Sequence, residues 1–412
     1  MDSGSSHKRI QLNILLVLMV NGAMGAPLLG PVRETLQDQT GLSRGRLGLW
    51  IFVIGTLGSA LGLIAGILGQ HIKRTTLFRI GVVLETLACL LLVMAKPGPG
   101  WLLLSLAMAW LLLGSARTMT NTGNGIFTDI WRHSPHTGVI LLHAVNAGGK
   151  LLAPLAVLAI GTALRPNAAA FTALLVLLLI GSWFWPAADV DSLKQAEQRQ
   201  ARPDRPALPR NFAIWLCAVQ FGFIAGSEAG ATAILASLMQ TLRNAPAAWP
   251  WPDKWPAAMT AVMLLGIVLG RIVFMISSRK LGERAILIIC LLCGFAALPA
   301  ALATHPGVYV PALLLTGVCF SATWPAFFSL AARAYPAEKT FLSLSSAFFT
   351  AVGVSGCIYL SSAVGNETSR LPLAFIASTA VMILFALYLF ATPFGRRLES
   401  AELAAGGDTT AL

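Results

Sequence analysis

Long apolar segments separated by short polar ones dominate the pattern along the chain. Uncharged runs occupy 12–32, 49–70 and 371–394. Each is as long as the roughly 20 residues that a helix needs to cross the hydrocarbon core of a membrane. The pattern predicts spans at 10–32, 47–69, 76–95, 101–127, 137–163, 168–187, 211–242, 257–277, 284–303, 307–332, 340–363 and 371–394.

A polar segment divides these twelve predicted spans into two groups of six. Residues 188–210 are rich in charge and proline, which is typical of a flexible linker. We therefore expect an all-α membrane protein with an N-terminal six-helix bundle at 1–187, a linker at 188–210, a C-terminal six-helix bundle at 211–397 and a polar tail at 398–412. Two such halves are typical of transporters built from parallel repeats.

Composition and charge agree with a membrane protein. Only 11% of residues are charged, against about 25% in a soluble domain. The net charge of +12 comes mainly from Lys and Arg in short loops. Because basic loops stay on the cytoplasmic side, this bias places both termini and the linker in the cytoplasm. The bias also accounts for the positive charge without nucleic acid as a partner.

Motifs for catalysis or metal binding are not found in the sequence. There is no Walker A loop and no H-E-x-x-H, and the six cysteines lie inside apolar segments. Cys290 and Cys293 form a C-x-x-C, which we interpret as two packing residues one turn apart. We therefore expect no enzyme, no catalytic residue, no metal site and no cofactor.

Two short basic loops carry a recognisable motif. The loop at 66–74 begins with Gly66 and ends with Arg74, and the loop at 275–284 contains Lys280-Leu-Gly282 and ends with Arg284. They resemble the signature G-x-x-x-D-R-x-G-R-[RK] of the major facilitator superfamily. The resemblance implies twelve spans, alternating access and a likeness of the two halves. The acidic residue that helps to latch the family's cytoplasmic gate is replaced here by Gln70 and Arg279.

A narrower resemblance lies in the fourth and fifth predicted spans. The segments 121–129 (NTGNGIFTD) and 142–149 (LHAVNAGG) are similar to the fucose/glucose permease-like sugar transporters. The resemblance places His143 and Asn146 where that branch has sugar-binding amides, and Asn121 where it has an acidic, proton-coupling residue. Because that acid is absent, the resemblance does not carry proton coupling over to Asn121.

Polar side chains inside the spans are the candidate site, since they are costly in a membrane. Two helical faces carry Arg117, Asn121, Asn124 and Thr128, and His143, Asn146 and Lys150. Two such stripes indicate a water-accessible cavity, although Asn and Thr also join helices by hydrogen bonds. The predicted substrate-binding residues are Arg117, Asn121, Asn124, His143, Asn146, Lys150 and Trp324, the last as a stacking surface.

Three charged residues, Glu228, Asp129 and Arg271, form the predicted proton-coupling or gating site. Glu228, near the middle of the seventh span, could neutralise Lys150 or Arg117 across the two halves, either as a gate or as a static ion pair. Asp129 and Arg271 lie nearer the ends of their spans and are assigned to the same group. Glu85, in the third span, could serve in packing, in snorkelling or in a site.

These observations predict a secondary transporter, such as a symporter, in the bacterial inner membrane. The resemblance favours a sugar, whereas the cations favour a sugar acid or organic anion, with H⁺ as a candidate coupling ion. Alternatives are a drug or lipid exporter, and a non-transporting protein of the same fold that acts in assembly or sensing. We expect a monomer that has a small-molecule substrate and the lipid bilayer as its partners.

Overall fold

The computed structural model describes most of the apolar chain. The described residues are 3–24, 36–68, 74–95, 99–130, 135–160, 165–183, 212–242, 247, 249–277, 281, 283–335 and 339–391. Within these ranges the chain forms helices and no β-strand. The predicted linker and tail lie outside them, and so do 69–73, 278–280 and 282 of the two signature loops.

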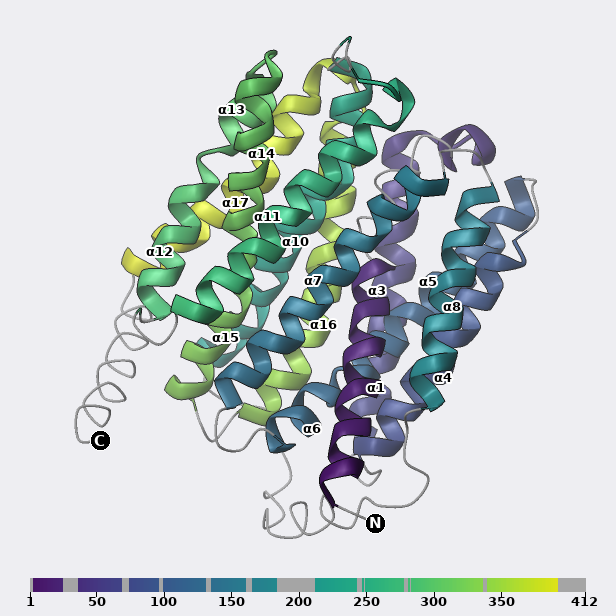
Figure 1. Cartoon of the computed structure of the whole chain (residues 1–412), viewed down its shortest axis with the longest axis vertical. Coiled ribbons are helices and arrows are strands. Elements are labelled where there is room, and N and C mark those ends of the chain that lie inside the picture. Colours follow the sequence, from purple (N-terminus) through teal and green to yellow (C-terminus); the bar gives the residue numbers. More distant parts are fainter. Residues whose placement is uncertain are drawn as a thin grey trace.

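The helices are long and run roughly side by side (Figure 1). Those before the linker are α1 (Ser3–Ala23), α3 (Arg44–Leu68), α4 (Arg74–Val93), α5 (Pro99–Thr120), α6 (Thr122–Ile130), α7 (Pro135–Ile160) and α8 (Arg165–Trp183). Those after it are α10 (Phe212–Leu242), η2 (Pro252–Lys254), α11 (Trp255–Ser277), α12 (Glu283–Gly294), α13 (Ala297–Leu302), α14 (Pro306–Ser321), α15 (Thr323–Ala334), α16 (Lys339–Val364), η4 (Thr368–Arg370) and α17 (Leu371–Ala391).

Length and composition show that the chain is a multi-pass membrane protein. Among the described residues, eight helices are long and apolar enough to cross a membrane. A helix suits this environment because all its backbone hydrogen bonds close within one segment. The count of twelve crossings and the side on which the termini lie stay predictions.

The outer surface of the bundle is apolar where lipid would touch it. In α3 the exposed large apolar side chains include Trp50, Val53, Leu57, Leu61 and Ile64. Their spacing of three or four residues places them on one face of the helix. In water such a stripe would be unfavourable, whereas acyl chains solvate it.

Three predicted spans are interrupted rather than continuous. The span at 101–127 breaks at Asn121, between α5 and α6, and the spans at 284–303 and 307–332 break between α12 and α13 and between α14 and α15. Proline explains the last break, because Pro325 has no N–H to donate to the carbonyl of Ser321. That carbonyl is then available to another helix.

Glycine brings two helices of the N-terminal half into backbone contact. A Cβ atom at Gly149 of α7 would overlap the carbonyl oxygen of Met19 in α1, and one at Gly22 would overlap that of Asn146. The close approach lets Asn146 Nδ2 donate a 3.0 Å hydrogen bond to Leu18 O. α1 and α7 are therefore fixed against each other next to Lys150.

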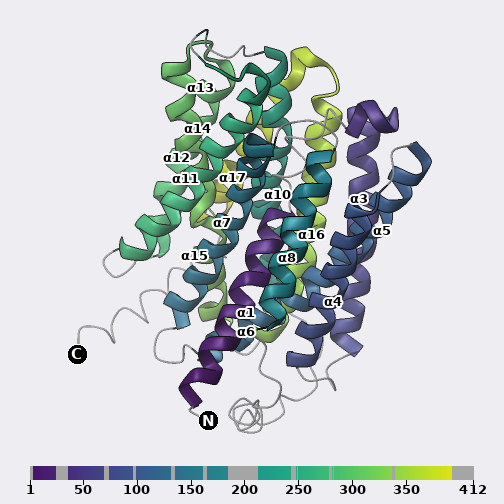
Figure 2. The ribbon, with the colours of Figure 1, turned by 45° about the vertical axis from the view of Figure 1, so that its right-hand side comes forward.

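Helices from the two predicted halves meet along two lines. α3 packs against α16, and α7 packs against α11. Figure 2 shows α7 and α16 in the middle of the molecule, with α3, α4 and α5 on one side and α12, α13 and α14 on the other. A polar group on the side of α7, α11 or α16 that contacts the other half can therefore interact with residues of both halves.

Candidate functional site

An ion pair joins α7 to α10 across the two halves. Lys150 Nζ donates a hydrogen bond to Glu228 Oε1, and the two side chains are only 21% and 12% exposed. The sequence left Lys150 and Arg117 open as partners of Glu228, and in the structure the partner is Lys150. The pair therefore links the two predicted halves through a contact that has little access to solvent.

Arg271 forms a second link between the halves. It is buried in α11, and its Nε donates a 2.8 Å hydrogen bond to Ser321 O, the carbonyl that Pro325 leaves without a helical donor. Its Nη1 donates to the backbone oxygen of His143 in α7. The guanidinium therefore ties α11 to both α14 and α7.

Trp324 lies in a group of aromatic rings rather than beside an open cavity. Its ring centroid is 4.5 Å from that of His143, 5.1 Å from that of Phe221 and 5.4 Å from that of Phe328, on which it is stacked. Its Nε1 donates to Thr350 Oγ1 at 3.3 Å. With its neighbours already in contact, Trp324 fits packing in this conformation better than stacking on a solute.

Arg117 faces a recess between the halves. The recess encloses about 460 Å³ of space between atoms and includes open solvent. Its walls come from α1, α3, α5 and α16, and it is lined by Met24, Ile51, Gly55, Ser59, Trp110, Leu113, Gly114, Arg117, Ala351, Val354, Ser355 and Ile358. Arg117 is the charged member of this lining.

Hydrogen bonds hold Arg117 at the edge of that recess. Its Nη2 donates to Asn21 O in α1 at 3.3 Å. Asn21 Nδ2 in turn donates to Thr120 Oγ1, one turn along α5, at 3.1 Å. Arg117 Nε is buried and has no hydrogen-bond partner in the part of the chain described. The guanidinium therefore keeps donor capacity for an anion.

The predicted amide residues are not all brought to this recess. Asn146 bonds to Leu18 O and so joins two helices, which was the alternative to lining a cavity. Asn121 sits at the break between α5 and α6, where its backbone N–H donates to Arg117 O. Asn124 and Asp129 lie in α6, and their side chains fall outside the described residues.

The centre of the molecule carries more positive than negative charge. Lys150 interacts electrostatically with the cations Arg271 and Arg117 as well as with Glu228. Among the described residues, these three cations interact with two acids, Glu228 and, through Arg117, Glu85. Such an excess inside a low-dielectric bundle attracts anions.

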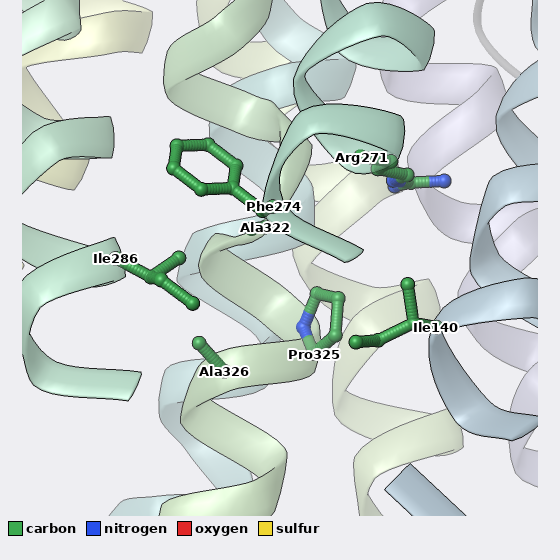
Figure 3. A pocket seen from close by; sticks show the side chains of 7 residues that line it. All are labelled: Ile140, Arg271, Phe274, Ile286, Ala322, Pro325 and Ala326. Carbon is green, nitrogen blue, oxygen red and sulfur yellow. The ribbon is translucent and has the colours of Figure 1, made fainter. Parts of the chain in front are cut away.

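A second recess lies beside Arg271 and is mainly apolar. It encloses about 360 Å³, including open solvent, and is lined by Ile140, Arg271, Phe274, Ile286, Ala322, Pro325 and Ala326. Figure 3 shows Ile140 near Pro325, with the Arg271 guanidinium directed away from Phe274. Because Arg271 is engaged by Ser321 and His143, this recess offers less polar chemistry than the one beside Arg117.

Comparison with known proteins identifies the family. The family model described as Major Facilitator Superfamily matches residues 14–360, which is most of the chain. The chain belongs to the Major Facilitator Superfamily. The family and its fold are those of membrane transporters, and the resemblance seen in the loops is confirmed at this level.

Solved structures of the superfamily share the fold. A variant of the E. coli fucose:proton symporter FucP has 18% sequence identity and a TM-score of 0.60, over 93% of this chain and 98% of that one. A bacterial homologue of the iron transporter ferroportin, in an outward-facing state, has 15% identity and a TM-score of 0.65 over the same shares. At such identities the likeness shows the fold alone. No curated protein matches the chain.

Several residues that line the Arg117 recess were not singled out from the sequence. They include Gly55 and Ser59 in α3 and Ser355 in α16. A signal was present, because Gly55 and Ser59 are four residues apart and so share one helical face. Small residues can serve packing as well as cavities, and the contact of α3 with α16 brings these three to the wall of the recess.

Proposed function

We propose that this superfamily member is a secondary transporter that moves a small anionic solute, a sugar acid or another organic anion. It would work by alternating access in a bacterial-type inner membrane, with twelve spans and both termini in the cytoplasm. The observation that carries the proposal is Arg117, which lines a recess between the halves and retains an unused donor.

The surrounding charges support an anion over a neutral solute. Arg117, Lys150 and Arg271 interact within one region, with Glu228 as the acid paired to Lys150. A neutral sugar would gain little from this excess, whereas a carboxylate or phosphate can take a bidentate hydrogen bond from a guanidinium.

Contacts at one end of the bundle support alternating access. Arg44 Nη1 donates to Gly365 O at 2.6 Å, and Lys254 Nζ donates to Leu158 O at 2.8 Å. Arg44 begins α3 and Leu158 lies near the end of α7. Both of these helix ends lie opposite to the start of α1, at the upper end of Figure 1. With a cytoplasmic N-terminus this is the outer end, so these bonds would form the outer gate in its closed state.

Proton coupling is part of the proposal. The fucose:proton symporter is a structural neighbour, and Asn121 takes the place of the acid expected from that branch. Glu228 is engaged by Lys150, so any proton that moves with the solute has to use that pair or another carboxyl.

Transport into proteoliposomes tests the proposal. The wild-type protein and Arg117→Gln are reconstituted and supplied with labelled sugar acids, organic anions and neutral sugars. Hydrogen bonds to charged groups contribute about 1.5–3 kcal/mol, so the variant should take up its anion about tenfold to a hundredfold less well. Arg46→Gln, which changes an exposed arginine, is the control.

Different outcomes separate the alternatives. Uptake of a neutral sugar in preference to every anion would contradict the assignment of Arg117. Flux of apolar drugs or lipids would favour the exporter. A folded protein that moves no member of the panel would favour the non-transporting role in assembly or sensing.

A further inference from the structure

A second carboxyl group is buried away from the Lys150–Glu228 pair. Glu85, in the middle of α4, is 0% exposed, and neither of its carboxyl oxygens has a hydrogen-bond partner in the described part of the chain. Burying an unpaired carboxylate costs several kcal/mol, whereas a neutral carboxyl loses much less solvation. This position therefore suits a carboxyl group that carries a proton.

The position faces Arg117. Gly81, one turn before Glu85, lies against Ala116 and Thr120 of α5, because a Cβ atom there would come within 3.0 Å of both residues. α4 and α5 thus align so that the charge of Arg117 acts on Glu85. Arg117 is the group of opposite charge that this carboxyl senses.

The other neighbours of Glu85 are uncharged where they are described. Cys89, one turn along α4, has its Sγ 3.2 Å from Met24 Sδ of α1. α4 also packs against α6 and α8, and the described side chains of 172–182 in α8 include no charged group. In α6 the side chain of Asp129 lies outside the described residues, and Arg79 of α4 itself is exposed.

Arg117 both lines the recess and interacts electrostatically with Glu85. Arg117 and Met24 both line the recess, and Met24 also contacts Cys89 of α4. The Nε of Arg117 is buried without a partner among the described residues. The charge of one guanidinium therefore acts both on a solute in the recess and on the ionised form of Glu85.

We propose that Glu85 is the proton-binding site of this transporter, and that it competes with the anionic solute for Arg117. The inference rests on the proposed function and deepens it. With Glu85 protonated, Arg117 holds the anion. When the carboxyl O–H bond breaks and the proton passes to water, the carboxylate attracts Arg117 and the anion is released. One proton therefore travels with one bound anion.

An infrared measurement tests the proton site without any transport. A protonated carboxyl has a C=O stretch that a carboxylate lacks. The purified wild-type protein should show this band at neutral pH, Glu85→Gln should lose it and Glu85→Asp should keep it. Gln has the shape of the neutral acid and so preserves the fold. A band that persists unchanged in Glu85→Gln, or that is absent from the wild type, overturns the proposal.

A transport measurement tests the coupling. In proteoliposomes with an imposed pH gradient, Glu85→Gln should accumulate the anion at least tenfold less than the wild type does. Glu367→Gln, which changes an exposed acid, should behave as wild type. Equal accumulation by Glu85→Gln overturns the proposal. If the wild type itself moves no solute, the proposed function fails, and the infrared band still decides whether Glu85 holds the proton.

Discussion

The Lys150–Glu228 pair concentrates opposite charges where water has little access. Removing one partner leaves the other charge unpaired in the interior, which costs about 3–5 kcal/mol. We predict that Lys150→Ala and Glu228→Gln each lower the thermal unfolding temperature and abolish transport while the protein still inserts. The double variant Lys150→Met/Glu228→Leu should regain stability without regaining transport.

The matched control for that prediction is the exposed pair of Glu367 and Arg370, whose side chains are 61% and 59% exposed. Such a pair contributes about 0–1 kcal/mol, so Glu367→Gln should change neither unfolding nor uptake. Normal transport by both Lys150→Ala and Glu228→Gln would contradict a gating role for the pair.

At the residue scale the sequence located the polar groups inside the predicted spans, but it did not give their neighbours. Glu228 was expected to meet Lys150 or Arg117, and only the packing of α7 on the second half shows that it meets Lys150. Glu85 was left open, because nothing along the third span indicates that the charge of Arg117 in the next span acts on it. Spacing along one helix fixes a face, but not which helix covers it.

At the scale of single helices, the contact of α1 with α7 depends on a glycine. A Cβ atom at Gly149 would overlap the backbone of Met19, whereas one at Gly148 would meet nothing within 4 Å. We predict that Gly149→Val destabilises the protein by at least about 1–3 kcal/mol through overpacking. Gly148→Val makes the same glycine-to-valine change in the same helix, so it alters helix propensity equally. It should unfold nearly as the wild type does. Thermal unfolding of the two variants checks this, and equal loss in both would contradict it.

The presence of helices could be predicted from the runs of apolar residues, whereas the breaks within those helices could not. The apolar run at 307–332 contains Pro311 and Pro325, yet only the second accompanies a break, since α14 continues through Pro311. The difference lies in tertiary partners. The carbonyl of Ser321, which Pro325 cannot bond, is taken by Arg271 from α11, and a hydropathy pattern does not contain that information.

At the scale of the whole molecule, the family and the membrane fold followed from the sequence because they depend on the order of apolar runs and on two loop motifs. The conformation of the molecule did not follow from the sequence, because it depends on contacts between distant segments. Arg44 and Gly365 are 321 residues apart, and Lys254 and Leu158 are 96 apart. Such contacts can differ between conformations of a transporter, while the sequence is common to all of them.

These end contacts give the last prediction. Each bond has a charged donor and contributes about 1.5–3 kcal/mol, so Arg44→Ala/Lys254→Ala should shift the balance towards an open outer end by at least about tenfold. Opening would expose Ser355, which is buried and lines the Arg117 recess. Ser355→Cys would report it by labelling with a membrane-impermeant thiol reagent from outside.

The background for this labelling needs Cys293→Ser and Cys357→Ser, since the other four cysteines are buried. Arg46→Ala, an exposed arginine two residues beyond Arg44, is the matched control and should label as slowly as the parent. Faster labelling in Arg44→Ala/Lys254→Ala alone would identify these bonds as the outer gate. Equal labelling rates in the parent, Arg46→Ala and Arg44→Ala/Lys254→Ala would mean that the two bonds do not hold the outer end closed. A gate at that end would then depend on the apolar packing of α3 against α16.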